Sequence, residues 1–323
     1  MRISMQQAAD MLLKNDNILI LAHASPDGDT LGSSYALCQA LQILGKNARV
    51  QCQDEIPDCY RFIVDGVKEM EFEPEFYVTV DVAALELLGT PEYYNELRGK
   101  INLSIDHHVT NTGYADFTCI EDGDIAAAAA ETVLQIIRMM ETPIDREIAE
   151  GIYVGLATDT GCFRYANTTS RTMRMAADMI DCKIDLKFIN KTIFETRTKT
   201  YHALETMALH EMSITDDGEI AILVVTREMF EKSGSKESEF HPLKSIPRQI
   251  EGVKVGITMR ESDKDTYRVA IRTNDGINAS HIAAHFGGGG HPGAAGCTVH
   301  GKAKDITDEF IRVIREEMVR QGK

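Results

Sequence analysis

Residues 17–31, with the sequence NILILAHASPDGDTL, decide the fold class of this chain. The apolar run at 17–22 has the length and composition of a strand, and residues 23–29 form a polar, turn-like stretch. Apolar residues then recur with helical spacing over about 30–44, just before Gly45. A strand that passes through a short turn into a helix is typical of a parallel α/β sheet.

The same alternation continues through the first 190 residues. Further strand-like runs lie at 48–53, 76–80 and 100–105, and helical patterns lie at 124–140 and 145–157. We therefore expect residues 1–190 to form an N-terminal domain built on a parallel sheet. Residues 191–215 have a helical and polar pattern, and we interpret them as a helical linker.

Residues 216–323 have a different order of elements. They contain a strand-like run, two strands of antiparallel appearance, a helix, a glycine-rich run and a closing helix, at 219–226, 253–261, 266–273, 279–286, 287–296 and 305–320. This order favours a smaller α/β domain with a mixed sheet. The predicted fold class is therefore α/β, with two domains joined by a helical linker.

The composition is globular and indicates no membrane segment. Hydrophobic residues make up 43% of the 323 residues, and the longest apolar runs stay below the roughly 18–20 residues of a membrane span. The seven cysteines are scattered and contain no CxxC pair, which disfavours a disulfide framework or a zinc knuckle. The N-terminus lacks the apolar centre of a signal peptide, so we expect a cytoplasmic protein.

The formal net charge of −16 limits the class of ligand. Proteins that wrap long nucleic acid usually carry a basic surface, so this charge disfavours binding of long duplexes. A small anionic substrate stays compatible with the charge, because bound divalent cations reverse the local field.

The turn-like stretch places His23, Asp27 and Asp29 in one tight loop. Taken alone, PDGD is a common turn sequence in which an Asp caps the next helix. The alternative is that one imidazole and two carboxylates bind cations, because Mn²⁺ and Mg²⁺ prefer oxygen ligands with some nitrogen. Two carboxylates that are one residue apart can reach two adjacent ions.

Further groups of the same chemistry follow predicted strands or a helix: Asp81, Asp106-His107-His108 and Asp159. Each of them alone has a simple explanation as a cap, a solvated loop or a turn. In an open parallel sheet, however, side chains that follow the carboxyl ends of the strands converge on one crevice. The ratio of carboxylates to histidines then suits two cations roughly 3.5–4 Å apart.

In these motifs the chain resembles the DHH phosphoesterases. Residues 23–32, HASPDGDTLG, are similar to the first motif of that family, Asp81 to the second, Asp106-His107-His108 to the third and Asp159 to the fourth. Residues 287–296, GGGGHPGAAG, resemble the signature of the associated DHHA1 domain. The resemblance covers nearly the whole chain, in order.

The resemblance implies a role for each motif residue. His23, Asp27 and Asp81 would bind one divalent cation. The second cation would be bound by Asp29, Asp81, His107 and Asp159. The family usually prefers manganese, with magnesium or cobalt as alternatives. Two such cations lower the pKa of water and stabilise charge on the phosphoryl oxygens, while His108 would assist the departing oxygen. Asp81 and His108 are therefore the expected catalytic residues.

The glycine-rich run is the candidate substrate-binding segment. Backbone N–H groups of Gly288, Gly289 and Gly290 can approach an anion or a base without obstruction by side chains. His291 and Arg272 can add charge-assisted contacts to a terminal phosphate. The alternative is a hairpin whose glycines only permit a tight turn. Weaker candidates for substrate contact are Arg164, Asn278 and His285.

Within the superfamily, the chain is similar to the stand-alone DHH–DHHA1 enzymes. It lacks the length of RecJ-type exonucleases, the membrane segments of cyclic-dinucleotide phosphodiesterases, and the different second domain of the pyrophosphatases. The resemblance implies release of mononucleotides from RNA of two to five residues and conversion of 3′-phosphoadenosine 5′-phosphate to AMP. The alternatives are cleavage of cyclic di-AMP or pApA, and a catalytically silent nucleotide-binding module. Partners beyond these substrates are limited to a possible homodimer.

Overall fold

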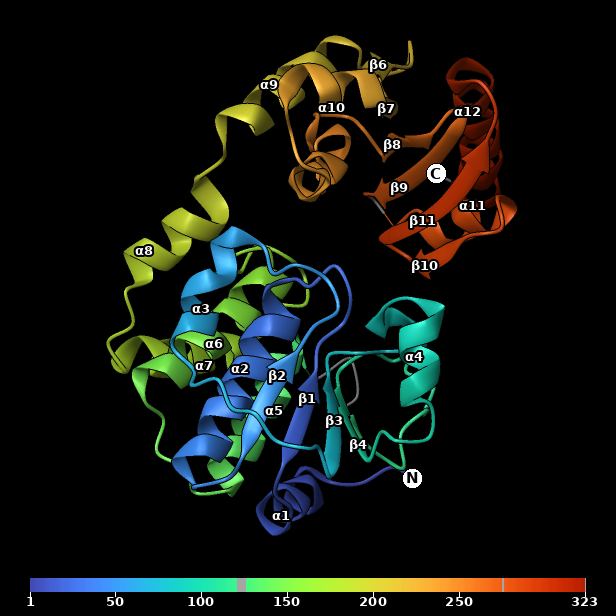
Figure 1. Cartoon of the computed structure of the whole chain (residues 1–323). Coiled ribbons are helices and arrows are strands. Elements are labelled where there is room, and N and C mark those ends of the chain that lie inside the picture. The colour runs from blue at the N-terminus through green and yellow to red at the C-terminus, as the bar shows by residue number, and fades with distance from the viewer. Residues whose placement is uncertain (121–125, 275, 323) are drawn as a thin grey trace. The chain divides into compact units, whose positions relative to one another are not determined.

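The computed structural model describes residues 1–120, 126–274 and 276–322, and of His241 and His291 it describes only the backbone. The chain divides into two compact units, Met1–Thr196 and Arg197–Lys323. We call them the N-terminal and the C-terminal unit and describe each by itself (Figure 1).

The N-terminal unit is built on a five-stranded parallel sheet of order β2-β1-β3-β4-β5 (Figure 1). The strands are β1 (Ile18–Leu21), β2 (Ala48–Gln51), β3 (Phe76–Val80), β4 (Leu103–Asp106) and β5 (Phe117–Ile120). All neighbouring pairs run parallel. Parallel strands need cover on both faces, and this need explains their short, apolar sequences.

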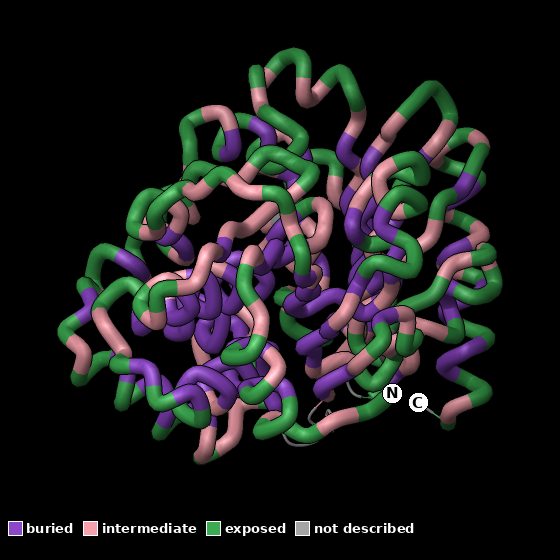
Figure 2. Tube along the Cα trace, turned by 60° about the horizontal axis from the view of Figure 1, so that its bottom comes forward, coloured by how far each residue is buried: buried purple, intermediate pink, exposed green. Residues whose placement is uncertain are grey.

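Helices cover both faces of this sheet. The helices of the unit are α1 (Met5–Lys14), α2 (Gly28–Ile43), α3 (Arg61–Asp65), α4 (Pro91–Leu97), α5 (Ala129–Met139), α6 (Arg146–Asp159), α7 (Ser170–Asp181) and α8 (Leu186–Asn190). Helices α1, α2, α5 and α6 share one hydrophobic core with one face of the sheet. On the other face, Leu19 and Leu21 pack with α4 and with the 3₁₀ turn Leu85–Leu88. Figure 2 shows that the buried residues lie toward the interior of the trace and the exposed residues toward its outside.

Helices α2 and α6 pack with their backbones in close contact. A Cβ atom at Gly32 would lie 2.2 Å from the carbonyl oxygen of Gly151, and one at Gly155 would lie 2.6 Å from Oδ1 of Asp29. Only glycine leaves room for this approach. The contact brings the start of α2, which carries Asp29, beside the end of α6, which carries Asp159.

The C-terminal unit contains a six-stranded sheet of order β10-β11-β9-β8-β7-β6. Its strands are β6 (Ser213–Ile214), β7 (Ile220–Val225), β8 (Val255–Asp263), β9 (Thr266–Thr273), β10 (Gly289–His291) and β11 (Ala294–His300). Strands β7 and β8 are parallel and the other pairs are antiparallel. The mixed sheet confirms the predicted fold class, as does the parallel sheet of the N-terminal unit.

The two faces of this second sheet have different cover. Its helices are α9 (Lys199–His210), α10 (Arg227–Ser233), α11 (Ala279–His285) and α12 (Ala303–Arg320). Helices α11 and α12 share one core with Val255, Ile257 and Ile271. On the other face, α9 and the 3₁₀ segment Glu237–Ser245 pack against Leu223 and Val225.

The structure adds elements that the sequence patterns did not indicate, notably β5, β11 and α7. The helix expected at 124–140 begins at Ala129 within the described residues, and 124–125 lie outside them. The segment interpreted as a linker is divided between the units, because Ile193 belongs to the N-terminal core and α9 to the C-terminal one. Among the described residues, no helix combines the length and the apolar character that crossing a membrane requires.

The glycine contact between α2 and α6 gives a first prediction. Gly32→Ala forces the two helices apart and should destabilise the protein by about 1–3 kcal/mol. The matched control is Gly66→Ala, where the nearest atom is the flexible Cγ of Glu147 at 3.2 Å. Urea denaturation of both variants measures the difference. Equal midpoints for the two variants would show that the contact is not close.

Candidate metal centre

The loop between β1 and α2 presents His23 and Asp27 toward Asp81. Nδ1 of His23 lies 2.8 Å from the carbonyl oxygen of Ala24, so Nε2 faces the carboxylates. That Nε2 lies 3.8 Å from Oδ1 of Asp27 and 3.8 Å from Oδ2 of Asp81. A ring whose Nδ1–H is held by a carbonyl presents Nε2 as a lone pair, which is the form that binds metals.

Asp27 also caps α2. Its Oδ1 accepts hydrogen bonds from the backbone N–H groups of Asp29 at 3.0 Å and Thr30 at 3.1 Å. Burial favours the neutral acid, but His23 and these two N–H groups outweigh it and lower the pKa of Asp27 to about 2. The capping role and the proximity to the other carboxylates therefore occur together in one side chain.

Asp29 is fully buried and is bound to the N-terminus of α5. Its Oδ2 accepts from the N–H of Ala129 at 2.7 Å, and its Oδ1 accepts from Ala130 at 3.0 Å and from the hydroxyl of Ser33 at 2.9 Å. The residue at the start of α5, Ala128, provides no side-chain cap, so Asp29 satisfies these donors from 100 residues away.

Asp81 follows β3 with a backbone φ of 61°, a conformation that Asp tolerates better than most residues. Its side chain is 4% exposed, and within the described residues Oδ1 has no hydrogen-bond partner. That Oδ1 lies 3.4 Å from Nε2 of His107 and 3.5 Å from Nδ1 of His108. A buried carboxylate oxygen without a hydrogen bond is costly unless a cation is close.

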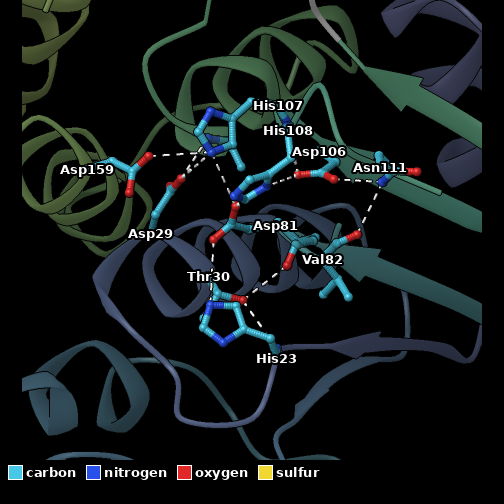
Figure 3. A network of polar contacts seen from close by, with 12 residues as sticks. His23, Asp29, Thr30, Asp81, Val82, Asp106, His107, His108, Asn111 and Asp159 are labelled. Carbon is cyan, nitrogen blue, oxygen red and sulfur yellow. Dashed lines mark hydrogen bonds and ion pairs between the residues drawn. The ribbon is translucent and has the colours of Figure 1, made fainter. Parts of the chain in front are cut away.

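Asp106 orients the two histidines that follow it (Figure 3). Its Oδ1 accepts from the N–H groups of His107 at 2.8 Å and His108 at 3.2 Å, and it lies 2.7 Å from Nδ1 of His108. Its Oδ2 accepts from Nδ2 of Asn111 at 2.6 Å. Burial raises the pKa of Asp106, but His108 and Asn111 outweigh this effect, so the carboxylate stays ionised.

His107 points away from Asp106 and toward three other carboxylates (Figure 3). Its Nε2 lies 3.4 Å from Oδ2 of Asp159, 3.4 Å from Oδ1 of Asp81 and 3.9 Å from Oδ2 of Asp29. Asp159 is the last residue of α6, and its carbonyl oxygen accepts from Nδ2 of Asn167 at 3.2 Å. The amide of Asn167 also donates to Ala127, just before α5.

The carboxylates of the site are too close together and too far from solvent for all of them to be ionised at little cost. Burial raises the pKa of Asp29, Asp81 and Asp159, and the charges of the neighbouring carboxylates raise those of Asp81 and Asp159 well above the ordinary range. Burial alone lowers the pKa of His23, but Asp27 and Asp81 outweigh this effect and raise it to about 9. The surroundings therefore favour positive charge, which a divalent cation supplies.

The donor atoms fall into three groups that suit a divalent cation. The groups are His23, Asp27 and Asp81; Asp29, His107 and Asp159; and Asp81, His107 and His108, with one donor atom of each residue within 4.8 Å of the others. An ion about 2.1 Å from each of two donors holds those donors about 3–4 Å apart. The separations of 3.4–3.9 Å in the cluster agree with that spacing.

The glycines of the β10–β11 hairpin differ in whether packing leaves room for a side chain. A Cβ at Gly288 would lie 2.2 Å from the carbonyl oxygen of Gly296, and one at Gly290 would lie 2.6 Å from that of Ala294. Both are therefore required by the β10–β11 hairpin. Gly289 has no atom within 4 Å of a Cβ position and has no positive φ, so the fold itself does not require a glycine there.

The other expected contact residues lie in both units. Arg272 is half-buried on β9, and one of its guanidinium N–H groups donates to the carbonyl of Ile271 at 3.0 Å. The side chain of His291 lies outside the described part of the structure. Asn278 caps α11, and Nε2 of His285 lies 3.5 Å from Glu309 on α12. Arg164 is exposed in the turn after α6 and donates from Nε to the carbonyl of Gly161 at 2.6 Å.

Sequence reasoning gave no role to Asp106, Asn111 or Asn167. Asp106 was visible as the first residue of its motif, but its function depends on contacts with the following loop. No sequence pattern marks Asn111 or Asn167 as important, because the hydrogen-bond partners of their amides come close only in the folded chain.

Two protein-family models match the chain. The family model described as "DHH family, N-terminal domain" matches residues 17–156. The model described as "DHHA1 domain" matches residues 219–319. The chain belongs to the DHH–DHHA1 family of phosphoesterases.

Two curated relatives cover nearly the whole chain. The bifunctional oligoribonuclease and PAP phosphatase NrnA of Thermus thermophilus is 31% identical over 309 residues, which are 94% of this chain and 91% of the relative. The protein of the same description from Bacillus subtilis is 24% identical over 290 residues, which are 88% of this chain and 90% of the relative.

Two solved structures show the same fold. An exopolyphosphatase-related protein from Bacteroides fragilis superposes with a TM-score of 0.89 at 23% identity, covering 99% of this chain and 98% of that one. RecJ from Thermus thermophilus, in complex with Mn²⁺, gives a TM-score of 0.55 at 13% identity, covering 98% of this chain and 55% of that one.

The orphaned oxygen of Asp81 gives a prediction for Asp81→Asn, which keeps the side-chain shape and tolerates the positive φ. The substitution removes one buried negative charge, so the melting temperature of the metal-stripped protein should rise, by ~2–4 °C for each 1 kcal/mol gained. The stabilisation by Mn²⁺ should be lost, together with phosphoesterase activity. Differential scanning calorimetry with and without Mn²⁺ measures both effects. Undiminished stabilisation by Mn²⁺ in the variant would exclude Asp81 as a ligand.

A second prediction concerns Asp106→Asn, which removes the charge that orients His108. Metal-dependent stabilisation should stay near wild type, because Asp106 belongs to none of the three donor groups. The kcat should fall by about a hundredfold, the scale of losing one positioned proton donor. Measuring turnover and metal affinity in the same preparation tests whether kcat falls while metal binding is kept. A parallel loss of metal affinity would place Asp106 among the ligands instead.

Proposed function

We propose that this protein is a metal-dependent hydrolase that releases mononucleotides from oligoribonucleotides of two to five residues. The same activity would convert 3′-phosphoadenosine 5′-phosphate to AMP. The observation that carries this proposal is the convergence of buried Asp29 and Asp81 and half-buried Asp159 with three histidines, in a chain whose relative at 31% identity is named for both activities.

We propose that the cluster binds two divalent cations and prefers Mn²⁺, with Mg²⁺ and Co²⁺ as alternatives. His23, Asp27 and Asp81 would hold one cation. Asp29, Asp81, His107 and Asp159 would hold the other. When bound, the two cations supply Lewis acidity, which lowers the pKa of water and offsets charge on the phosphoryl oxygens. The RecJ structure with Mn²⁺ shows that a protein of this fold takes that metal.

The chain's own proton donor in this proposal is His108. Oδ1 of Asp106 lies 2.7 Å from Nδ1 of His108 and so fixes the orientation of the ring. Nε2, at the opposite edge of the ring, would donate a proton to the oxygen that leaves the phosphorus. Asn111 fixes the far oxygen of Asp106 and thereby the orientation of the pair.

We propose that the C-terminal unit binds the remainder of the substrate. Arg272 would contact a phosphate, and the backbone of Gly288, Gly289 and Gly290 would contact phosphate or base, together with His291. The open space around the Cβ position of Gly289 supports this assignment. Arg164 is a further candidate, because it stands exposed a few residues after Asp159.

The setting of this activity would be the cytoplasm. The seven cysteines all lie in the part of the chain that the structure describes and form no disulfide, and a reducing compartment suits that state. Short RNA and small nucleotides are the proposed ligands, and long duplexes are excluded from the proposal by the charge of −16. Homodimer formation stays a prediction that mass measurement in solution tests.

The proposal is tested by comparing substrates side by side with Mn²⁺. The panel is a 5′-phosphorylated RNA dinucleotide, 3′-phosphoadenosine 5′-phosphate, pApA, cyclic di-AMP, pyrophosphate and a 20-residue RNA. We expect release of mononucleotides from the dinucleotides and of phosphate from the bisphosphate, with little product from the 20-residue RNA. EDTA should abolish turnover and added Mn²⁺ should restore it. Fastest cleavage of cyclic di-AMP would reassign the substrate, and bound metal without any turnover would indicate a silent nucleotide-binding module.

A further inference from the structure

The acidic excess of the chain belongs almost entirely to the N-terminal unit. Residues 1–196 contain 16 Lys and Arg against 31 Asp and Glu, whereas residues 197–323 contain 18 against 19. The C-terminal unit is therefore near neutral. A few cations gathered on one of its faces can dominate the local field, which is what recognition of a phosphate chain requires.

The register of β8 and β9 gathers arginines on one face of the second sheet. Arg260 pairs directly with Arg268, and Gly256 pairs with Arg272. Directly paired residues share a face, and so do residues two apart on one strand. Arg260, Arg268 and Arg272 therefore lie on the same face. Val269 and Ile271 point to the opposite face, where α11 and α12 cover the core.

Lys244 adds a fourth cation to this face. It lies on the 3₁₀ segment Glu237–Ser245, and its Nζ is 5.8 Å from the ring centre of Phe240, where the guanidinium of Arg260 approaches to 5.6 Å. Burial lowers the pKa of Lys244, and the charges of Arg272, Arg260 and Arg268 lower it further, to about 8. The four cations are thus close enough to repel one another.

Negative charge within the chain compensates only part of this cluster. Arg260 forms an ion pair with Glu237 at 2.6 Å. Among the residues that the structure describes, neither Lys244 nor Arg268 forms an ion pair with an acidic side chain. Like charges directly opposite each other on a sheet are unfavourable, as Arg260 and Arg268 are here. A bound anion would relieve that repulsion.

A strip without long side chains separates Arg268 from Arg272. Ala270 lies between them on β9 and pairs with Gly296 of β11, which pairs in turn with Gly289 of β10. Ala270 and Gly296 are half-exposed and Gly289 is exposed. The two arginines are four residues apart on the strand, about 13 Å. Each side chain can bend inward, so together they can reach two phosphates on either side of one nucleoside.

We infer that this face binds two consecutive phosphates of the part of an RNA that is not being cleaved. Arg272 would contact the phosphate that every proposed substrate possesses. Arg268 and Lys244 would contact the next one, with the intervening nucleoside on the strip of Ala270, Gly296 and Gly289. Guanidinium groups bind phosphate oxygens in a bidentate manner, and the ammonium adds a point charge. This inference rests on the proposed function and makes Arg268 a residue that sets preference for chain length.

The test compares substrates that differ by one phosphate. A 5′-phosphorylated dinucleotide keeps one phosphate outside the cleaved bond, and a 5′-phosphorylated trinucleotide keeps two. Arg268→Ala should raise the KM for the trinucleotide about tenfold and leave that for the dinucleotide and for 3′-phosphoadenosine 5′-phosphate unchanged. Lys244→Met, which keeps the shape of the side chain, should likewise raise the KM for the trinucleotide relative to that for the dinucleotide. In each variant, the slope of the logarithm of the trinucleotide binding constant against the logarithm of the salt concentration should fall by about 1 in magnitude.

The matched control is Lys304→Ala, which removes the same charge from α12 on the opposite face of the sheet. Equal effects of Arg268→Ala on both chain lengths, or no effect beyond that of Lys304→Ala, would overturn the inference. Equilibrium binding of the trinucleotide to the full-length protein in EDTA makes the same comparison without turnover. If wild-type protein cleaves none of the substrates, the proposed function fails. The binding comparison still decides whether this face binds two consecutive phosphates.

Discussion

Repulsion among buried carboxylates is the constraint on which the N-terminal unit depends. Asp29 and Asp81 are almost entirely removed from solvent, and Asp159 stands beside them around one imidazole, that of His107. Packing alone does not tolerate such a group, because each ionised carboxylate loses hydration and meets its neighbours at close range. Under the proposed function, divalent cations that share the oxygens would make the arrangement favourable, and the surrounding fold would hold the carboxylates in place for them.

The fold holds these residues with backbone features that have no other evident use. Asp81 takes a left-handed conformation, and Asp29 is held by the first N–H groups of α5. Glycine-to-glycine packing of α2 against α6 sets the distance between Asp29 and Asp159. Strained conformations that cluster around polar groups usually mark a functional site. The proposed metal centre is thus a product of the whole parallel sheet and its helices rather than of one loop.

The sequence predicted the parts of this account that depend on local pattern. The run at 17–31 indicated the strand, turn and helix that carry His23, Asp27 and Asp29, and the same logic found β3 and β4 before Asp81 and Asp106. It did not find β11, because Ala294–His300 lacks the large apolar residues that signal a strand. Nor did it find the roles of Asn111 and Asn167 or the pairing of Arg260 with Arg268, since register and long-range hydrogen bonds are set by tertiary packing.

The most direct test of the central claim is the position of bound metal. Crystals of the full-length protein grown with Mn²⁺ would be measured at the manganese absorption edge, and anomalous peaks would be located against the side chains. We predict two peaks in each chain, one bounded by His23, Asp27 and Asp81 and the other by Asp29, His107 and Asp159, with Asp81 next to both. A map with no peak beside Asp81, or with a single peak at Asp106 and His108, would contradict it.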